Sequence, residues 1–109
     1  MSHSVKWTKK ADKDYSQILQ YLKEEFGLKV AVNFKTKVEK EINRITKWPK
    51  MNPISEFLKI VRRAVIVKQV SLYYVEIEYK KEIIVIRLYD NRKNTENIAS
   101  DLNKEISNL

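Results

Sequence analysis

The chain has 109 residues, 43% of them hydrophobic, which suits one domain spanning residues 1–109 with its own core and leaves no room for a second. It contains no cysteine, so disulfides, thiolate catalysis and thiolate metal sites are excluded. The formal net charge of +8 indicates an anionic partner, either nucleic acid or an acidic protein, although a charged surface can also serve only to keep a protein dissolved.

The positive charge is concentrated in the middle of the chain. Residues 44–68 carry seven Lys or Arg residues against Glu56 alone, a net charge of +6. The N-terminus lacks the apolar stretch of a signal peptide, and no window approaches the roughly 20 apolar residues of a membrane-spanning helix. We therefore expect a cytoplasmic protein that makes no membrane contact.

The first half of the chain predicts a short strand followed by a helical hairpin. Residues 5–7 favour a strand, and Thr8 stands at the N-cap position of a helix that Gly27 ends. A second helix follows and stops before Pro49. Apolar residues three and four apart give each helix one apolar face. These faces consist of Ala11, Tyr15, Ile18, Leu19 and Leu22, and of Ala31, Phe34, Val38, Ile42 and Ile45.

The second half predicts strands at 60–67, 72–79 and 82–89, and then a short helix within 94–109. Alternating apolar and polar residues in the strand predicted at 72–79 indicate that one face of this strand is buried and the other is exposed to solvent. Continuous apolar residues at 83–86 predict a strand near the centre of the sheet. The expected order is β-α-α-β-β-β-(α), an α+β fold in which the helical hairpin packs on a twisted antiparallel sheet.

Few residue types remain that can carry chemistry. The single glycine excludes phosphate-binding loops, and the only histidine, His3, lies in a terminus that we expect to be frayed. Without cysteine or a usable histidine, neither a zinc site nor a serine–histidine pair can form. We expect no metal and no cofactor, so any reaction would depend on Arg, Lys and Tyr.

Basic residues and tyrosines gather on the predicted strands. Arg62 and Arg63 are adjacent in one strand, so their side chains point to opposite faces, and Arg92 follows the last strand. Each also has a structural explanation, such as protection of a sheet edge or an ion pair between Asp90 and Arg92. Together they predict a positively charged surface beside the last strand. The target-binding candidates are Arg62, Arg63, Arg87, Tyr89, Arg92 and Lys93.

Several segments match a known sequence pattern. They are Lys6-Trp7-Thr8-Lys9-Lys10-Ala11-x-x-Asp14, Ile18-Leu19-x-Tyr21-Leu22, Ala31-x-x-Phe34, Val61-Arg62-Arg63, Tyr73-Tyr74 and, above all, Ile86-Arg87-Leu88-Tyr89-Asp90-Asn91-Arg92. They cover roughly residues 5–98, nearly the whole chain. In these segments the sequence resembles ParE-like toxins, also called plasmid stabilisation proteins, of the RelE/ParE superfamily of type II toxin–antitoxin systems.

The resemblance implies one of two toxic activities. RelE-like members are ribosome-dependent mRNA endonucleases, whereas ParE-like members share the fold and inhibit DNA gyrase by binding. The positions that match the RelE pattern, and are therefore the catalytic candidates, are Lys59, Arg62 and Arg92.

This sequence departs from the RelE pattern at two points. Tyr73 and Tyr74 stand where those nucleases carry an arginine. The tyrosine that RelE-like nucleases often carry late in the chain is missing from this sequence. Losing an arginine that stabilises an anionic phosphorane costs several kcal/mol. We therefore favour the non-enzymatic, ParE-like function. RNA cleavage is the alternative, and a non-toxic basic module that binds nucleic acid is a third.

The resemblance also implies a cognate antitoxin, with which the chain would form a hetero-oligomer. Antitoxins resemble extended, partly acidic segments that fold on contact, wrapping the helical hairpin and the sheet edge. The charge of +8 suits such a partner, and the unpaired chain would expose apolar surface between its helices. The antitoxin-binding candidates are Ile18, Leu22, Phe34 and Val38.

Overall fold

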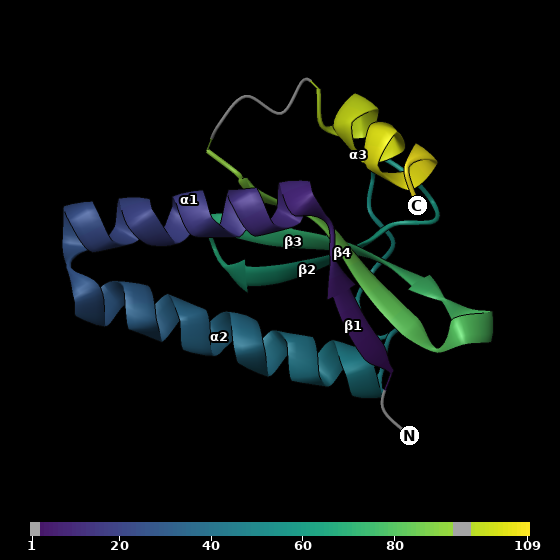
Figure 1. Cartoon of the computed structure of the whole chain (residues 1–109), viewed down its shortest axis with the longest axis horizontal. Helices are drawn as coiled ribbons and strands as arrows, with labels where there is room; N and C mark the ends of the chain where they lie inside the picture. The colour runs from purple at the N-terminus through teal and green to yellow at the C-terminus, as the bar shows by residue number, and fades with distance from the viewer. Residues whose placement is uncertain (1–2, 93–96) are drawn as a thin grey trace.

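The computed structural model describes residues 3–92 and 97–109, and within them a helical hairpin packs on a four-stranded sheet (Figure 1). The elements follow the order expected from the sequence, which confirms the α+β architecture. They are β1 (Ser4–Trp7), α1 (Lys9–Phe26), α2 (Leu28–Lys47), β2 (Arg62–Val67), β3 (Val70–Ile77), β4 (Glu82–Asp90) and α3 (Ile98–Ser107). No helix in the described part of the chain combines the length and apolar character needed to cross a membrane.

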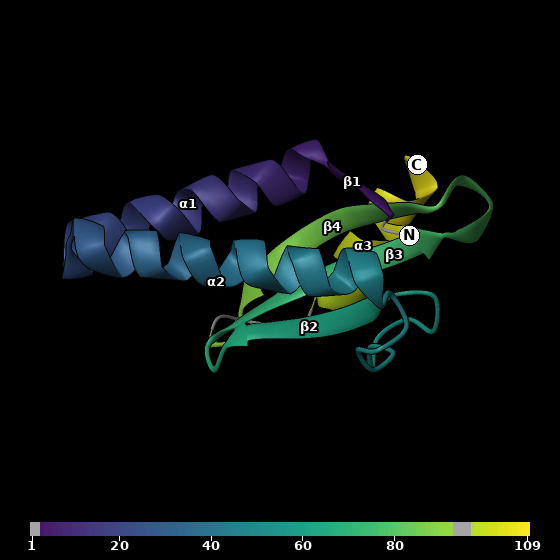
Figure 2. The same cartoon turned by 90° about the horizontal axis from the view of Figure 1, so that it is seen from below.

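The helical hairpin begins and turns at the predicted residues. The Oγ1 atom of Thr8 accepts a hydrogen bond of 3.0 Å from the backbone N–H of Ala11, as an N-cap residue does. Gly27 separates α1 from α2 with φ of 94° and ψ of 167°, a conformation that is essentially restricted to glycine. The two helices then run side by side, and their shared tip projects beyond the sheet (Figure 2).

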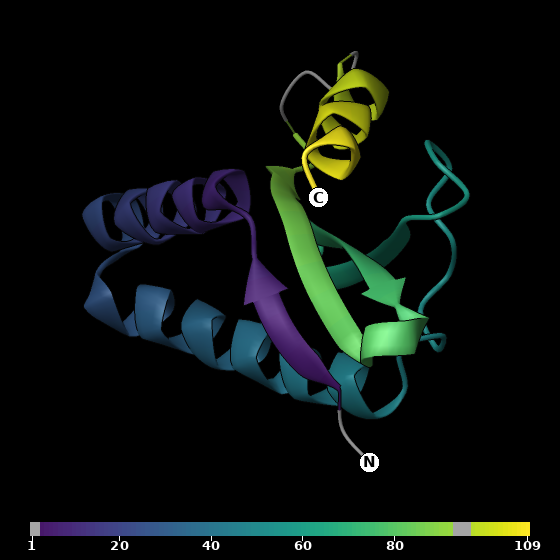
Figure 3. The ribbon, with the colours of Figure 1, turned by 45° about the vertical axis from the view of Figure 1, so that its right-hand side comes forward.

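The sheet is mixed, so the expectation of an antiparallel sheet was wrong for one strand. The strand order is β1-β4-β3-β2, with β3 antiparallel to both of its neighbours and β1 parallel to β4 (Figure 3). The helical hairpin carries the chain from one edge of the sheet to the other, which leaves β1 beside the last strand. Strand β4 lies inside the sheet, as its apolar run predicted.

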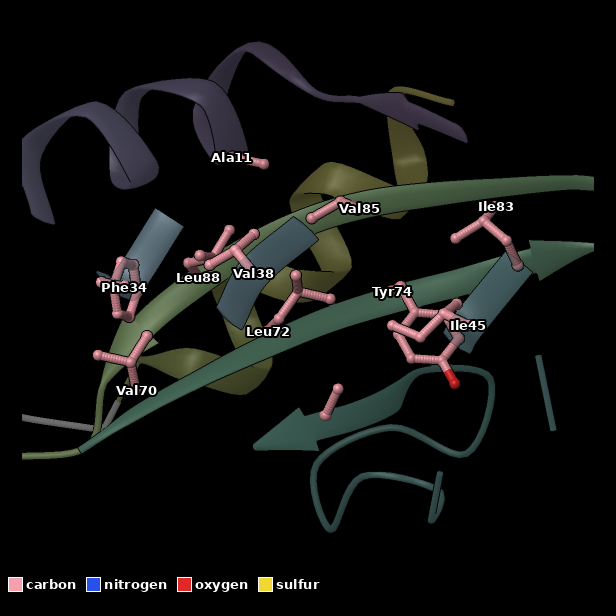
Figure 4. Close-up of a cluster of buried hydrophobic side chains, with 11 residues drawn as sticks. Ala11, Phe34, Val38, Ile45, Val70, Leu72, Tyr74, Ile83, Val85 and Leu88 are labelled. Carbon is pink, nitrogen blue, oxygen red and sulfur yellow. The ribbon is translucent and has the colours of Figure 1, made fainter. Parts of the chain in front are cut away.

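Each face of the sheet has its own hydrophobic core, and this corrects the expectation of a wet face on β3. Residues 70–75 are all buried, because α3 and the loop before β2 cover the face that the helical hairpin leaves open. The hairpin core lies under α1 and α2 and includes Ala11, Phe34, Val38, Ile45, Leu72, Tyr74, Ile83, Val85 and Leu88 (Figure 4). The α3 core consists of Val61, Tyr73, Val75, Ile86, Ile98 and Leu102.

A bulge in β4 sets which side chains reach each core. Tyr73 pairs with Arg87 and Tyr74 with Val85, so Ile86 is an extra residue in β4. Because of this extra residue, Leu88 joins Val85 in the hairpin core although the two are three positions apart. The bulge also places Arg87 next to α1, where it contributes to the site described below.

Candidate functional site

A groove of ≈ 770 Å³ opens between the helical hairpin and one end of the sheet. The tip that α1 and α2 share projects beyond this end of the sheet, so the last turns of α1 form part of one wall of the groove (Figure 2). That wall is the apolar side of the helical hairpin, and the other wall comes from the β2–β3 turn and the end of β4. The apolar lining of the whole groove consists of Ile18, Tyr21, Leu22, Phe26, Val30 and Phe34 from the hairpin, and Val67, Val70 and Leu88 from the sheet.

The groove gathers three of the four expected antitoxin-binding residues. Ile18, Leu22 and Phe34 line it, although Phe34 is only 5% exposed. Val38 is 2% exposed, belongs to the hairpin core as Phe34 does, and does not line the groove. The apolar stripe of α2 runs from the open groove into the closed core, and its spacing alone does not distinguish the two.

Sequence reasoning missed the most accessible apolar side chains of the groove. Tyr21, Phe26 and Val30 line it and are 45%, 59% and 40% exposed. The Tyr21 and Phe26 rings also contact each other edge to face, with centroids 6.2 Å apart. The sequence does contain a sign of them: these large apolar residues lie near Gly27 but do not belong to the regularly spaced apolar faces of the two helices.

Arg87 at the floor of the groove is bound by a carboxylate. Its Nε and Nη2 atoms donate to the two carboxylate oxygens of Asp14 at 2.7 and 3.1 Å, and Asp14 also accepts from the backbone N–H of Leu88. Burial lowers the pKa of Arg87, but the hydrogen bonds to Asp14 together with the charge interactions with Asp14, Tyr89 and Asp101 outweigh it, so the pKa is raised. Arg87 therefore joins β4 to α1 rather than facing a target.

Tyr89 connects β4 to α3. Its hydroxyl donates to the carboxylate of Asp101 at 2.9 Å, and the Arg87 guanidinium lies 4.6 Å from the centroid of its ring. Burial, together with the bond to Asp101, raises the pKa of Tyr89 well above its ordinary value. The hydroxyl is therefore a donor at neutral pH and is poorly suited to act as a base.

Arg62 and Arg63 point to opposite faces, as predicted, and each is used within the fold. Arg62 pairs with Tyr74 of the hairpin core, whereas Arg63 pairs with Tyr73 of the α3 core. The Nη1 atom of Arg62 donates to two loop carbonyls, at 3.2 and 2.7 Å. The Nε atom of Arg63 donates to the Ser71 hydroxyl at 2.9 Å.

Arg92 remains largely exposed at the rim of the groove. Its Nε and Nη2 atoms bind the Asp90 carboxylate at 3.0 and 2.8 Å, which confirms the ion pair considered from the sequence, yet 57% of its side chain is accessible. Lys59 is also exposed, in the loop before β2. Lys93 lies outside the described residues.

The expected arginines do not share one exposed face. Strands β2 and β4 are both antiparallel to β3, and the register places Arg62 across Tyr74 from Val85. Asp90, the last residue of β4, is five residues further along the strand, a separation of about 17 Å at 3.3 Å per residue, and Arg92 lies in the turn beyond it. The sequence pattern could not reveal this, because it does not contain the carbonyl and carboxylate partners that the fold brings to each arginine.

His3 is held in place, so the expectation of a frayed position was wrong. Its backbone N–H donates to the carbonyl of Thr46, and its Nε2 atom lies 2.9 Å from a carboxylate oxygen of Glu76. The contact joins the start of the chain to β3 and lies outside the groove.

Comparisons with known proteins agree with this architecture. The model of the family described as ParE toxin of type II toxin-antitoxin system, parDE, matches residues 5–95. The fold is similar to the chromosomal ParDE system of P. aeruginosa, with a TM-score of 0.69 and 21% identity over 82% of this chain and 96% of that one. A comparison with curated proteins gives no match.

Two further solved structures have the same fold. A double mutant of the E. coli toxin RelE in the free state gives a TM-score of 0.67 and 16% identity, covering 97% of this chain and 99% of that one. The toxin–antitoxin complex RelBE2 of Mycobacterium tuberculosis gives 0.59 and 15%, covering 83% and 99%. Identities this low establish the fold alone, but the family model spans most of the chain. The chain therefore belongs to the ParE toxin family of type II toxin–antitoxin systems.

Proposed function

We propose that the chain is a growth-inhibiting toxin, neutralised when a cognate antitoxin occupies the groove between the helical hairpin and the sheet. The groove carries this proposal: it is open, ≈ 770 Å³ in volume, and walled by exposed Tyr21, Phe26 and Val30. Contiguous exposed apolar surface of this kind marks a protein-binding site. The similar structures from P. aeruginosa and M. tuberculosis are of a toxin–antitoxin system and a toxin–antitoxin complex.

The shape of the groove suggests the form of the antitoxin segment. Its α1 wall runs from Asp14 to Phe26, about 18 Å at 1.5 Å per residue, which matches three turns of a helix. An amphipathic helix would lay its apolar face in the groove. Its outer face would be acidic, because the toxin carries a net charge of +8.

DNA gyrase is the target that we favour, which places the toxin in the cytoplasm. Of the arginines expected to meet the target, Arg92 keeps the most accessible guanidinium, and Lys93 follows it directly in the sequence. The pair with Asp90 is screened by water, so an acidic group of the target can displace it. Arg92 also lines the groove, so an antitoxin bound there would cover it. Neutralisation would then follow from direct competition.

Cleavage of RNA fits this geometry less well. A metal-independent nuclease needs its cations around a single phosphate, at hydrogen-bonding distance. Arg62 is separated by about 17 Å along the sheet from the end of β4 that precedes Arg92, and it already donates to two carbonyls. Lys59, Arg62 and Arg92 would have to converge through a rearrangement of the sheet.

Induced expression of the chain, with and without the neighbouring antitoxin gene, tests the proposal. We expect growth arrest that the antitoxin relieves, loss of supercoiling by purified gyrase in the presence of the toxin, and intact mRNA by primer extension. Cleaved mRNA with unaffected supercoiling would favour the nuclease alternative. Unchanged growth when the chain is expressed would favour the non-toxic module that binds nucleic acid and would contradict the proposed function.

A further inference from the structure

A second apolar surface lies at the C-terminal end of α2, where the helix passes into the loop before β2. A hollow of ≈ 710 Å³ there is lined by Lys47, Trp48, Pro49, Lys50, Met51 and Glu76. We call these six residues the Trp48 patch. Trp48 is 59% exposed and Met51 is 44% exposed. None of the six lines the groove described above, so the patch is a separate surface.

The backbone under the patch is fixed from inside the protein. The buried Tyr74 hydroxyl donates to the carbonyl of Pro49 at 2.7 Å, and Arg62 donates to the carbonyls of Lys50 and Asn52. The backbone N–H of Met51 closes a turn onto the carbonyl of Trp48. Two interior side chains thus hold the loop while its apolar side chains face outward. A partner that binds here would not have to order the loop.

The charges around the patch are not balanced. Lys50 pairs with Glu78 at 2.6 Å and Arg44 with Glu41 at 2.8 Å. Lys47 is exposed and has no carboxylate partner among the residues that the structure describes, whereas the Arg62 guanidinium is used to hold the loop carbonyls. One positive charge without a carboxylate partner therefore lies next to exposed Trp48. The complementary ligand places an apolar side chain in the hollow and a carboxylate beside it.

A protein segment fits this surface better than a nucleic acid does. The carboxylates of Glu41, Glu76 and Glu78 lie around the patch and would repel a chain of phosphates. A protein can place a single carboxylate next to Lys47 and an apolar side chain against the indole. Tryptophan also contributes most where an interface excludes water around it.

We propose that the Trp48 patch is a docking surface for an apolar segment that carries a single carboxylate, from the protein on which the toxin acts. This inference rests on the proposed function. The patch and Arg92 lie toward opposite ends of the sheet, so a target that meets both has a contact surface that extends along the sheet. An antitoxin seated in the groove covers Arg92 and leaves the patch accessible.

Two substitutions test the patch in the full chain. Trp48→Ala removes the indole, and Lys47→Glu reverses an exposed charge while leaving the packing unchanged. We expect each variant to need at least tenfold more expressed protein to arrest growth. Affinity for the antitoxin should stay at the wild-type value in both variants. The melting temperature should stay at the wild-type value in Trp48→Ala and fall slightly in Lys47→Glu, because Lys47 lies in the last turn of α2, where the helix dipole favours a cation. Tyr79→Ala is the matched control, because Tyr79 is an 86% exposed aromatic residue outside both surfaces, and it should remain fully toxic.

The outcomes separate this inference from the function on which it rests. A wild-type chain that does not arrest growth would contradict both the proposed function and this inference. A toxic wild type with two equally toxic variants would overturn the inference alone, and so would loss of antitoxin binding in Lys47→Glu, since the patch would then belong to the antitoxin interface. Binding of a single-stranded RNA oligonucleotide that Trp48→Ala weakens tenfold would assign the patch to nucleic acid and overturn it as well.

Discussion

The carboxylate of Asp14 in α1 accepts two hydrogen bonds, of 2.7 and 3.1 Å, from the guanidinium of Arg87 in β4. The two side chains are 14% and 15% exposed, so each would lose its main polar partner if the other were removed. Pairing of β1 with β4 ends at Trp7 and Val85, and beyond that point Asp14 accepts the backbone N–H of Leu88 instead. Asp14 therefore anchors α1 to the part of β4 that β1 does not reach.

Asp14→Ala should lower the free energy of unfolding by about 1–3 kcal/mol, because it leaves Arg87 partly buried without its carboxylate. Urea denaturation measures the change. Asp12→Ala, at an exposed position of the same helix, should cost no more than about 1 kcal/mol through loss of its interaction with the helix dipole. Equal effects of the two substitutions would contradict a structural role for the Asp14–Arg87 pair.

Gly27→Ala should destabilise the chain by about 1–3 kcal/mol through backbone strain alone. No atom lies within 4 Å of a Cβ built at this position, so the cost comes from the positive φ and not from a clash. Leu28→Ala, one residue further along and 63% exposed, should change stability by less than about 0.5 kcal/mol. Thermal denaturation compares the two, and a fully stable Gly27→Ala would mean that the hairpin turn can adopt another conformation.

Phe26→Ala should weaken antitoxin binding by roughly tenfold to a hundredfold, or about 1.4–2.8 kcal/mol, because this side chain is an exposed wall of the groove. Substitution of Phe26 tests the groove more directly than substitution of Ile18 or Leu22, because Ile18 and Leu22 also pack against the hairpin core and their loss would affect folding. Leu28→Ala is equally exposed but does not line the groove, and calorimetry should find its affinity unchanged. Equal losses from both substitutions would locate the antitoxin around the whole hairpin tip instead.

Arg92→Ala should reduce inhibition of gyrase supercoiling by at least tenfold without changing the stability of the chain. The side chain is 57% exposed, and its pair with Asp90 is screened by water. Lys104→Ala removes an exposed positive charge on α3 and should inhibit as the wild type does. If Arg92→Ala inhibits gyrase at wild-type concentrations, the proposed contact at the rim of the groove is wrong.

Stability should fall as the pH rises above about 10, the ordinary pKa of tyrosine. Burial raises the pKa of Tyr73, Tyr74 and Tyr89, so above this pH the unfolded chain loses protons that the folded chain keeps. The stabilisation is complete below the unfolded pKa and is lost toward the folded pKa. Unfolding measured between about pH 9 and pH 11 should show this slope, and Tyr89→Phe should make it shallower. A slope that is unchanged in Tyr89→Phe would contradict the assignment.

The elements of the fold could be predicted because their signals are local. Thr8 and Gly27 mark the ends of α1 through their own side chain and backbone preferences, and the apolar run in β4 indicates a strand buried on both faces. The pairing of β1 with β4 could not be predicted, since it joins Ser4 to Glu82 and depends on the path of the whole chain.

The candidate site was less predictable than the fold. Spacing places Ile18, Leu22, Phe34 and Val38 on the apolar faces of the two helices, but whether such a face lines the groove or is covered depends on how far the sheet extends beneath it. Ile18, Leu22 and Phe34 line the groove, whereas Val38 is covered. Arg62 was expected to face a target and instead binds loop carbonyls twelve and ten residues before it. Such contacts exist only in the folded chain.

The place of β4 between β1 and β3 has a consequence for how the molecule is made. This strand is the last of the four to be synthesised, yet it pairs with both the first strand and the third. While it is still missing, β1 has no strand beside it, whereas the contacts between α1 and α2 are close in sequence and can form early. The nascent chain should therefore exist for a time with β2 and β3 able to pair but β1 without a partner, and the four-stranded sheet should be completed only when translation is nearly finished.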